Sequence, residues 1–248
     1  MAVASYIICA TPRSGSTLLC DLLAQTGVAG HPDSFYRRES RDDFVREFGI
    51  ACGDGVDFDR RFLDAAIRAG AGETGMFGLR LMWPSMPELQ QTLGGLFPEA
   101  PTDTARLAAA FGAPLYIHLQ RTDKVAQAIS RSKAEQSGLW HRHADGSVRE
   151  QVHSYRAPQY DRAGIDRALA EVEEHEAAWH DWFAANAIGP LELTYEELSA
   201  EPAATLARVL FTLGRDPALA SDIRTRSGRL ADAESRAWAE RYLRETAR

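Results

Sequence analysis

Short apolar runs alternate with longer amphipathic stretches along this chain. The clearest apolar runs cover 5–10, 75–82, 114–119 and 190–194. Runs of this length, with few polar interruptions, predict strands buried on both faces, as in a parallel sheet. The first run leads into a polar loop and then into residues 17–26, whose pattern predicts a helix. A strand, a glycine-containing loop and a helix in this order predict the opening of an α/β fold.

Helical spacing of apolar residues recurs between these runs. The predicted helices cover 17–26, 42–48, 86–96, 102–111, a segment starting near 124, a long segment around 165–183, 202–213 and a final segment near 237. The rest of 31–60 is charged and irregular, and 141–164 has the composition of a long functional loop. No repeat or linker divides the chain. We therefore predict one α/β domain over 1–248, with a parallel sheet flanked by helices.

The composition argues against several classes of protein, among them nucleic-acid binders and membrane-spanning proteins. Hydrophobic residues make up 45% of the 248 residues, and the net charge is -7, so we expect no nucleic-acid partner. No apolar run is long enough to predict a membrane span. The three cysteines, Cys9, Cys20 and Cys52, lack a metal-binding spacing and are typical of reduced thiols. These features predict a cytoplasmic location.

The loop after the first strand has the composition of an anion site. Gly15 allows close backbone approach, and the N-terminus of the following helix offers unpaired N–H groups. Arg13 supplies a cation, while Ser14, Ser16 and Thr17 supply hydroxyl donors. The alternative is a structural strand–helix junction with serine and threonine caps.

The same loop occupies the frame of the nucleotide P-loop, G-x-x-x-x-G-K-[ST]. Ala10 replaces the first glycine, and Ser16 replaces the lysine that clamps the phosphates of ATP. The sheet is therefore predicted to be P-loop-like, with a loop suited to a phosphate-like group but not to ordinary ATP chemistry. A small-molecule kinase remains the alternative enzyme class.

A second candidate anion site follows the third apolar run. Arg121 lies just beyond it, where the carboxyl ends of parallel strands form ligand crevices, and Ser130 lies in the following helix. In the alternative interpretation, Arg121 only pairs with Asp123 on the surface. Two anion loops on one sheet edge would suit a ligand with phosphate at both ends.

These segments resemble the PAPS-dependent sulfotransferases, where PAPS is 3′-phosphoadenylyl sulfate. Residues 10–19 resemble the 5′-phosphosulfate loop, Arg121–Ser130 the 3′-phosphate element, and Tyr195–Pro202 another stretch of that class. Over nearly its whole length the chain resembles the bacterial trehalose 2-sulfotransferase family. The further matching runs are 26–30, 78–83, the helix to Trp140, 179–183 and 229–242.

The resemblance implies the sulfotransferase fold, PAPS as donor, adenosine 3′,5′-bisphosphate (PAP) as product, no metal, and a homodimer. The acceptor would be a sugar or a glycolipid precursor. Carried over by position, the donor contacts are Arg13, Ser14, Gly15, Ser16 and Thr17 for the 5′-phosphosulfate, and Arg121, Ser130 and Arg229 for the 3′-phosphate.

The sequence differs from the family pattern a few residues after Gly30. The family has a glutamate there, thought to be the general base, and this chain has Ser34. Asp33 or His31 would then accept the proton of the acceptor hydroxyl, although Asp33 could instead form an Asx turn beside Pro32. Activity could also be impaired, which leaves a nucleotide-binding homologue as an alternative.

Further side chains near this loop are predicted to contact the acceptor. They are Ser34, Tyr36, Arg37, Arg80 and Trp83, with Arg80 in place of a family lysine. In the alternative interpretation, Arg37 or its neighbour Arg38 is a solvated surface charge and Trp83 is partly core. His141 and His143 lack a carboxylate at zinc-ligand spacing, so no metal site is predicted.

Overall fold

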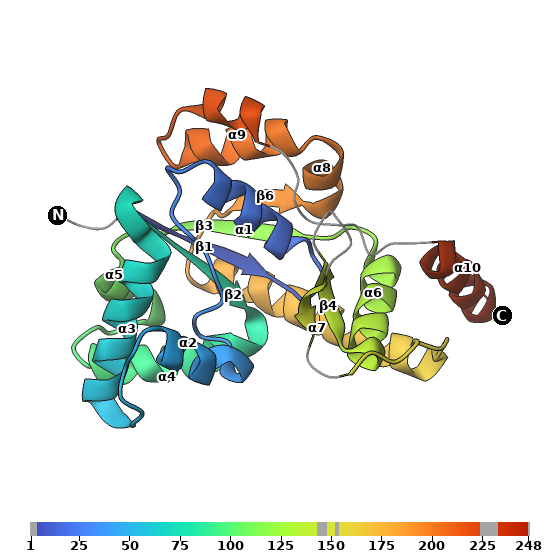
Figure 1. Ribbon diagram of the computed structural model, residues 1–248, viewed down its shortest axis with the longest axis horizontal. Coiled ribbons are helices and arrows are strands. Elements are labelled where there is room, and N and C mark those ends of the chain that lie inside the picture. The colour runs from blue at the N-terminus through green and yellow to red at the C-terminus, as the bar shows by residue number, and fades with distance from the viewer. Residues whose placement is uncertain (1–3, 143–147, 152–153, 224–232, 248) are drawn as a thin grey trace.

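A four-stranded parallel sheet forms the centre of the molecule (Figure 1). The computed structural model describes residues 4–142, 148–151, 154–223 and 233–247. The strand order is β2-β1-β3-β6. The strands are β1 (Ala4–Ala10), β2 (Met76–Met82), β3 (Leu115–Gln120) and β6 (Leu191–Thr194). All four lie within a residue or so of the apolar runs, which confirms the predicted α/β class.

Alternate residues of β1 enter two separate cores, which explains why this strand is apolar throughout. Tyr6 and Ile8 face a core built with α1 (Ser16–Gln25) and α9 (Pro202–Thr212). Helix α8 (Tyr195–Ala200) adds Leu198 to the same core. Successive side chains of a strand point to opposite faces, so the neighbours of these residues must be buried elsewhere.

The second core covers the opposite face of the sheet. Ile7 and Cys9 of β1 enter it, and Trp179 of α7 (Arg162–Ala185) is fully buried there. The helices that build this core are α3 (Gly55–Ala71), α4 (Met86–Leu96), α5 (Asp103–Phe111) and α7, with α2 (Arg41–Glu47) beside them.

A smaller third core joins the remaining helices at one end of the molecule. Helix α6 (Lys124–Ser137) packs on α7 and on α10 (Ala233–Thr246), which lies far from the sheet in Figure 1. Ile129, Ile165, Trp238 and Tyr242 are the largest residues of this core. Short 3-10 turns connect other elements: η1 (Arg38–Ser40), η2 (Gly72–Thr74), η3 (Trp83–Ser85) and η4 (Pro217–Asp222).

Two expectations from the sequence were wrong. The stretch described as irregular up to residue 60 contains the start of α3, which buries Phe58 and Phe62. The predicted loop 141–164 contains strand pairing between β4 (Leu139–Arg142) and β5 (Val148–Gln151), and α7 begins at its end. The two strands are only four residues each, and their apolar and polar residues do not alternate, so the sequence pattern does not predict them.

The position of β1 in the sheet defines where a ligand crevice forms. β2, the next strand in the chain, pairs with one edge of β1, and β3, the strand after that, pairs with the other edge. The segments following β1 and β3 lead into α1 and α6, which pack in different cores. Such a reversal of strand order is a topological switch point, and ligands bind outside the carboxyl ends of the strands there.

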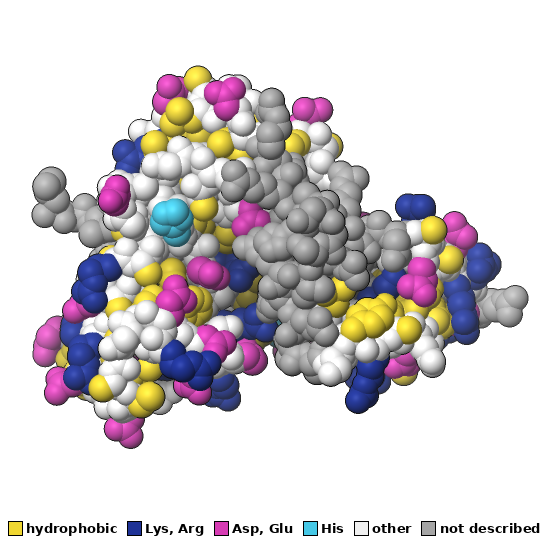
Figure 2. Space-filling view, in the orientation of Figure 1, with side chains coloured by type: hydrophobic (Ala, Val, Ile, Leu, Met, Phe, Trp, Pro, Cys, Tyr) yellow, Lys and Arg dark blue, Asp and Glu magenta, His cyan; other side chains and the backbone are white. Residues whose placement is uncertain are grey.

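Charged residues of both signs are mixed over the surface of α2, α3 and α4 (Figure 2). Interspersed charge of this kind is typical of a solvated face. Among the described residues, no helix combines the length and apolar character that crossing a membrane requires.

Candidate active site

The loop after β1 has the backbone shape of an anion cradle. Arg13 adopts a left-handed conformation with φ of 67°, and Gly15, the N-cap of α1, has φ of 89°. The Ser14 N–H donates to the Thr11 carbonyl at 3.3 Å, which closes the turn. The Ser14 hydroxyl is buried and has no hydrogen-bond partner among the described residues. An unsatisfied donor at a helix N-terminus fits an anionic ligand.

A tyrosine from α8 joins this loop to the loop after β3. A Cβ added at Gly15 would lie 2.6 Å from Cδ2 of Tyr195, so only glycine allows this approach. The Tyr195 ring also contacts the Arg121 guanidinium, whose carbon lies 4.7 Å from the ring centroid. This geometry is a cation–π interaction, and it brings the two predicted anion loops against one side chain.

Arg121 is held close to the first loop and is largely removed from water. Its Nη1 lies 3.5 Å from the Arg13 carbonyl oxygen, and its buried Nε has no hydrogen-bond partner among the described residues. Burial lowers the pKa of Arg121, while the nearby Tyr195 and Asp123 oppose this shift. A guanidinium remains protonated in proteins, so Arg121 keeps its positive charge and has a donor, Nε, that makes no hydrogen bond among the described residues.

Carboxylate and amide side chains fix the backbone of both loops. The Glu196 carboxylate accepts the backbone N–H groups of Thr122 at 3.1 Å and Asp123 at 3.3 Å. The buried Gln127 amide of α6 donates to the Thr11 hydroxyl and to the Pro12 carbonyl, both at 2.8 Å. The loops therefore hold their shape through contacts made within the protein itself.

The Arg13 side chain lies nearer the second loop than its predicted role implies. Its Nε donates to the Ser130 hydroxyl at 3.1 Å, and its Nη1 donates to the Trp140 carbonyl. Arg13 and Ser130 were predicted to contact opposite ends of the donor. The structure instead brings the two side chains together.

Arg80 connects the first loop to the segment after Gly30. Its Nη1 donates to the Thr17 hydroxyl at 2.6 Å, and its Nε donates to the Ser34 hydroxyl at 2.7 Å. Its Nη2 lies 3.3 Å from the Asp33 carboxylate, whose side chain is 52% exposed. One guanidinium thus links the loop after β1 to Ser34, the position where the resemblance expects a glutamate.

These elements surround one large cleft of about 1310 Å³. Of the predicted residues, the ones that line it are Arg13, Gly15, Ser16, Thr17, Ser34, Arg37, Arg80, Arg121 and Ser130. Helix α10 contributes Ser235 and Arg236 to the far wall. The cleft is larger than the usual range of about 300–1,000 Å³ for a small-molecule pocket, and its predicted anion contacts come from both loops.

Other predicted site residues lie away from the cleft. Tyr36 is only 2% exposed and packs edge-on against Phe62 in the core, so the structure does not support its predicted acceptor contact. Trp83 packs on Trp179, which agrees with the core alternative. His31 lies beside Gly72, before the start of β2, and is not among the cleft-lining residues that the structure describes.

Arg38 and Asp33 are not among the described residues that line the cleft. Arg38 is 85% exposed and pairs with Glu88, as expected of a solvated surface charge. The Asp33 carboxylate accepts the N–H of Ser34, a local contact that a turn residue also makes. Arg229 and His143 lie outside the described residues.

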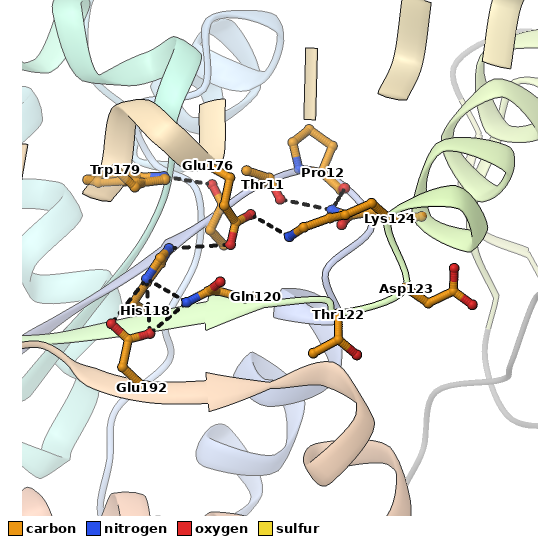
Figure 3. A network of polar contacts seen from close by, with 12 residues as sticks. Thr11, Pro12, His118, Gln120, Thr122, Asp123, Lys124, Glu176, Trp179 and Glu192 are labelled. Atoms are coloured by element: carbon orange, nitrogen blue, oxygen red, sulfur yellow. Dashed lines mark hydrogen bonds and ion pairs between the residues drawn. The ribbon is translucent and has the colours of Figure 1, made fainter. Parts of the chain in front are cut away.

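A polar network lies behind the second loop, between β3 and α7 (Figure 3). Glu176 of α7 lies 3.1 Å from the Lys124 ammonium and 3.8 Å from Nε2 of His118. Burial lowers the pKa of His118, and Glu192 and Glu176 oppose the shift. Lys124 is the first residue of α6, so the network anchors the helix that follows the Arg121 loop.

The parallel sheet and the two converging loops define a P-loop-like α/β protein with two candidate anion loops beside one cleft. Comparison with known proteins identifies the family within this class. The sequence profile of the Stf0 sulphotransferase family matches residues 5–245, and the chain belongs to this family.

Curated relatives align over almost the full length. A trehalose 2-sulfotransferase of Mycobacterium tuberculosis is 31% identical, with 100% of this chain and 97% of the relative covered. A second trehalose 2-sulfotransferase, from Mycolicibacterium smegmatis, is 30% identical, with 98% and 96% covered. The solved sulfotransferase domain of the Synechococcus PCC 7002 olefin synthase is 15% identical, covers 97% of this chain and 94% of its own, and has a TM-score of 0.46.

Sequence reasoning missed the side chains that shape the loops. Tyr195 and Glu196 belong to a stretch noted for its resemblance, but neither was given a role. Gln127 was not noted. The signal for Glu196 is weak, because its neighbour Glu197 forms an ordinary capping box with Thr194 and the two carboxylates look alike in sequence.

Proposed function

We propose that this protein transfers a sulfuryl group from PAPS to a hydroxyl of a small carbohydrate-like acceptor. The observation that carries the proposal is the pair of anion loops converging on one cleft, each with a buried polar atom that lacks a partner among the described residues. These atoms are the Ser14 hydroxyl and the Arg121 Nε. Family membership supplies the reaction class, and PAPS has anionic groups at both its 5′ and 3′ positions.

The donor would span the two loops. Its 5′-phosphosulfate would bind at the N-terminus of α1, where backbone N–H groups and the hydroxyls of Ser16 and Thr17 line the cleft. Its 3′-phosphate would bind Arg121 and Ser130. Arg13 reaches Ser130, so it would contribute charge between the two ends.

In the proposed reaction, the acceptor oxygen attacks sulfur in line with the bridging oxygen that leaves. A new S–O bond forms, the S–O bond to the phosphate breaks, and PAP departs with the electron pair. Arg80, the loop N–H groups and Arg13 would stabilise the charge that develops on the sulfuryl and phosphate oxygens. This part of the mechanism needs only positioning and fixed charge.

The acceptor proton would pass to Asp33. The Arg80 guanidinium contacts both Thr17 of the donor loop and Asp33, which keeps this carboxylate near the reacting atoms. His31 was the other predicted base, and its place beside Gly72 gives it no such link.

The names of the two curated relatives favour a sugar acceptor. Arg37 and Glu39 line the cleft on the acceptor side and form an ion pair at 3.3 Å, and groups of both kinds can bind sugar hydroxyls. The family match favours sulfuryl transfer over the kinase alternative. The cytoplasmic location and the homodimer stay predictions.

Calorimetric titration with PAP, and with ATP in parallel, tests the donor site. We expect tight PAP binding and weak ATP binding. Arg121→Ala should weaken PAP binding about tenfold to a hundredfold, because a charge-assisted contact is lost from a buried site. Arg38→Ala removes an equal charge outside the cleft and should bind PAP as the parent does.

Turnover completes the test. Incubation with PAPS and a panel of sugars including trehalose, read by mass spectrometry, should yield a sulfated sugar. PAP binding without any sulfated product would favour the impaired nucleotide-binding homologue. Absence of PAP binding in the folded protein would overturn the proposed donor site.

A further inference from the structure

Three potential metal ligands meet on the face of the sheet that α7 covers. His118 extends from β3, and Glu176 and His180 lie four residues apart on α7, so both face the same side of that helix. One nitrogen or oxygen atom from each residue lies within 4.8 Å of the others. Two histidines and one carboxylate form a donor set typical of zinc and related divalent ions.

Contacts on the far side of the His118 ring fix its orientation. Nδ1 lies 3.0 Å from the Glu192 carboxylate and 3.2 Å from the Gln120 amide nitrogen, and the amide donates to the same carboxylate at the shorter distance of 2.8 Å (Figure 3). A carboxylate accepts but cannot donate, so this contact favours the proton on Nδ1. The lone pair of Nε2 then points away from Glu192. A carboxylate that orients a histidine in this way is a common partner of metal-bound imidazole.

Two atoms on the near side make no hydrogen bond among the described residues. They are the buried Nε2 of His118 and Oε1 of Glu176, whereas Oε2 of Glu176 forms an ion pair with Lys124. His118 is 0% exposed and Glu176 is 7% exposed. Their 3.8 Å separation is too long for a hydrogen bond. A lone pair facing a carboxylate oxygen is unfavourable unless a cation lies between them.

The separation is close to what a shared metal ion requires. Zinc–ligand bonds of about 2.0–2.2 Å place two tetrahedral ligands about 3.4 Å apart. A contraction of a few tenths of an ångström would bring this pair to that distance. The three ligand atoms lie within 4.8 Å of one another, so closing the whole site requires side-chain movements of up to about an ångström and a half. Lys124 contacts Oε2 of Glu176 at 3.1 Å, which leaves Oε1, the atom nearer His118, for a metal.

We propose that His118, Glu176 and His180 form a binding site for a divalent transition-metal ion such as Zn²⁺. His180 is solvent-exposed and gives the ion a path of entry, while the other two ligands are buried. A water molecule would complete the tetrahedral coordination. The site is separate from the histidine pair that the sequence analysis rejected, and it does not depend on the proposed sulfuryl transfer.

The bound ion would join β3 to α7 beneath the donor loop. Lys124 shares Glu176 with the proposed site and begins α6 directly after the Arg121–Asp123 turn. The role of the ion is structural, because none of its three ligands lines the cleft described above. Metal binding should therefore raise the melting temperature even when no nucleotide is present.

The test uses the full chain, freed of metal by a chelator and dialysed. We expect one equivalent of Zn²⁺ in calorimetric titration and a tetrahedral Co²⁺ absorption spectrum. His180→Ala changes an exposed residue, so the variant should fold, and it should lose the Co²⁺ spectrum and the thermal shift. Glu192→Gln should weaken Zn²⁺ binding about tenfold to a hundredfold, because it weakens the bond that orients His118.

Glu173→Gln is the matched control, because it removes an exposed carboxylate from the same helix. It should bind Zn²⁺ as the parent does. Absence of stoichiometric Zn²⁺ and Co²⁺ binding would overturn the proposal and leave an ion-pair network of Lys124, Glu176 and His118. Binding that survives in His180→Ala with an unchanged Co²⁺ spectrum would also overturn it, by placing the ion elsewhere.

Discussion

At the scale of single residues, Arg80 shows how a departure from the family can be accommodated locally. The resemblance pairs a glutamate and a lysine where this chain has Ser34 and Arg80. The Arg80 fork reaches the Ser34 hydroxyl, the Thr17 hydroxyl and the Asp33 carboxylate at once. A single ammonium lacks this planar fork of donors, so the two departures fit each other.

Replacing Asp33 tests the base that this arrangement favours. We expect Asp33→Asn to lower kcat about a hundredfold to ten-thousandfold, the usual contribution of a general base, with PAP affinity unchanged. The measurement is steady-state turnover with PAPS and a responsive sugar, over a range of pH. Loss of the ascending limb of the pH profile would mark the removed base.

Glu39→Gln is the comparison for that variant. Glu39 is the other carboxylate of this segment and lines the cleft, with its side chain 70% exposed. We expect its replacement to change KM more than kcat. The opposite pattern, in which Glu39→Gln abolishes kcat and Asp33→Asn does not, would assign the base to Glu39.

Sequence reasoning succeeded best for residues whose role depends on local chain order. The loop after β1 was identified from its glycine, its hydroxyls and its place before a helix. The left-handed conformation of Arg13 and its contact with Ser130 depend on residues far away in the sequence. Tyr36 was misassigned because an aromatic beside a polar loop can point either into a cleft or into a core, and only packing decides.

At the scale of elements, α8 is a short helix whose first turn supports both donor loops. Tyr195 packs on Gly15 and Arg121, and Glu196 accepts two backbone N–H groups of the Arg121 loop. Burial favours a higher pKa for Glu196, but the hydrogen bonds from Thr122 and Asp123 outweigh it and lower the pKa. The ionised carboxylate is therefore the form that holds the loop.

Glu196→Gln should loosen this loop without unfolding the protein. We expect PAP affinity to fall about fivefold, as for a net loss of about 1 kcal/mol of hydrogen bonding, measured by calorimetry. Glu197→Gln is the matched control, because Glu197 caps α8 and does not accept the backbone N–H groups of the Arg121 loop that Glu196 accepts. Equal effects of the two substitutions on PAP affinity would contradict a specific role for Glu196.

The same residue gives a pH dependence of stability. A carboxyl with a lowered folded-state pKa stabilises the fold above its unfolded pKa, and this contribution disappears as pH falls through the folded value. The difference in unfolding free energy between the parent and Glu196→Gln should therefore shrink as pH falls below the ordinary glutamate range. Urea unfolding at several pH values between neutral and acidic would measure it.

Helix α3 shows where element prediction failed for an avoidable reason. Phe58, Phe62 and Ala66 recur at helical spacing, but the charged residues between them dominated the interpretation. The hairpin of β4 and β5 had no comparable signal. Its pairing depends on contact between two four-residue segments, and such contact cannot be read from the pattern of either segment alone.

At the scale of the whole molecule, α7 connects the second core to the end of the central strand. The Trp179 indole N–H donates to the carbonyl of Ala10 at 3.1 Å, and Ala10 is the last residue of β1 before the donor loop. Trp182 lies three residues further along the same helix. Its buried indole N–H has no hydrogen-bond partner among the described residues.

This contrast provides a matched pair of substitutions. Trp179→Phe removes both ring volume and a buried hydrogen bond, whereas Trp182→Phe removes ring volume and an unsatisfied donor. We expect Trp179→Phe to lower the unfolding free energy by about 1–3 kcal/mol more than Trp182→Phe does. Urea unfolding followed by circular dichroism measures the difference, and equal losses would mean that the contact with Ala10 adds no stability.

The two-faced burial of β1 also governs how the chain can fold while it is being made. This strand leaves the ribosome before either neighbour, and its pairings run from Tyr6 to Gly78 on one side and to Leu115 on the other. At ordinary synthesis rates the wait for β3 is on the order of ten seconds. Until β3 is made, β1 can pair with β2 on one edge but its other edge stays open, so nascent chains that stall between β2 and β3 should depend on chaperones to escape aggregation.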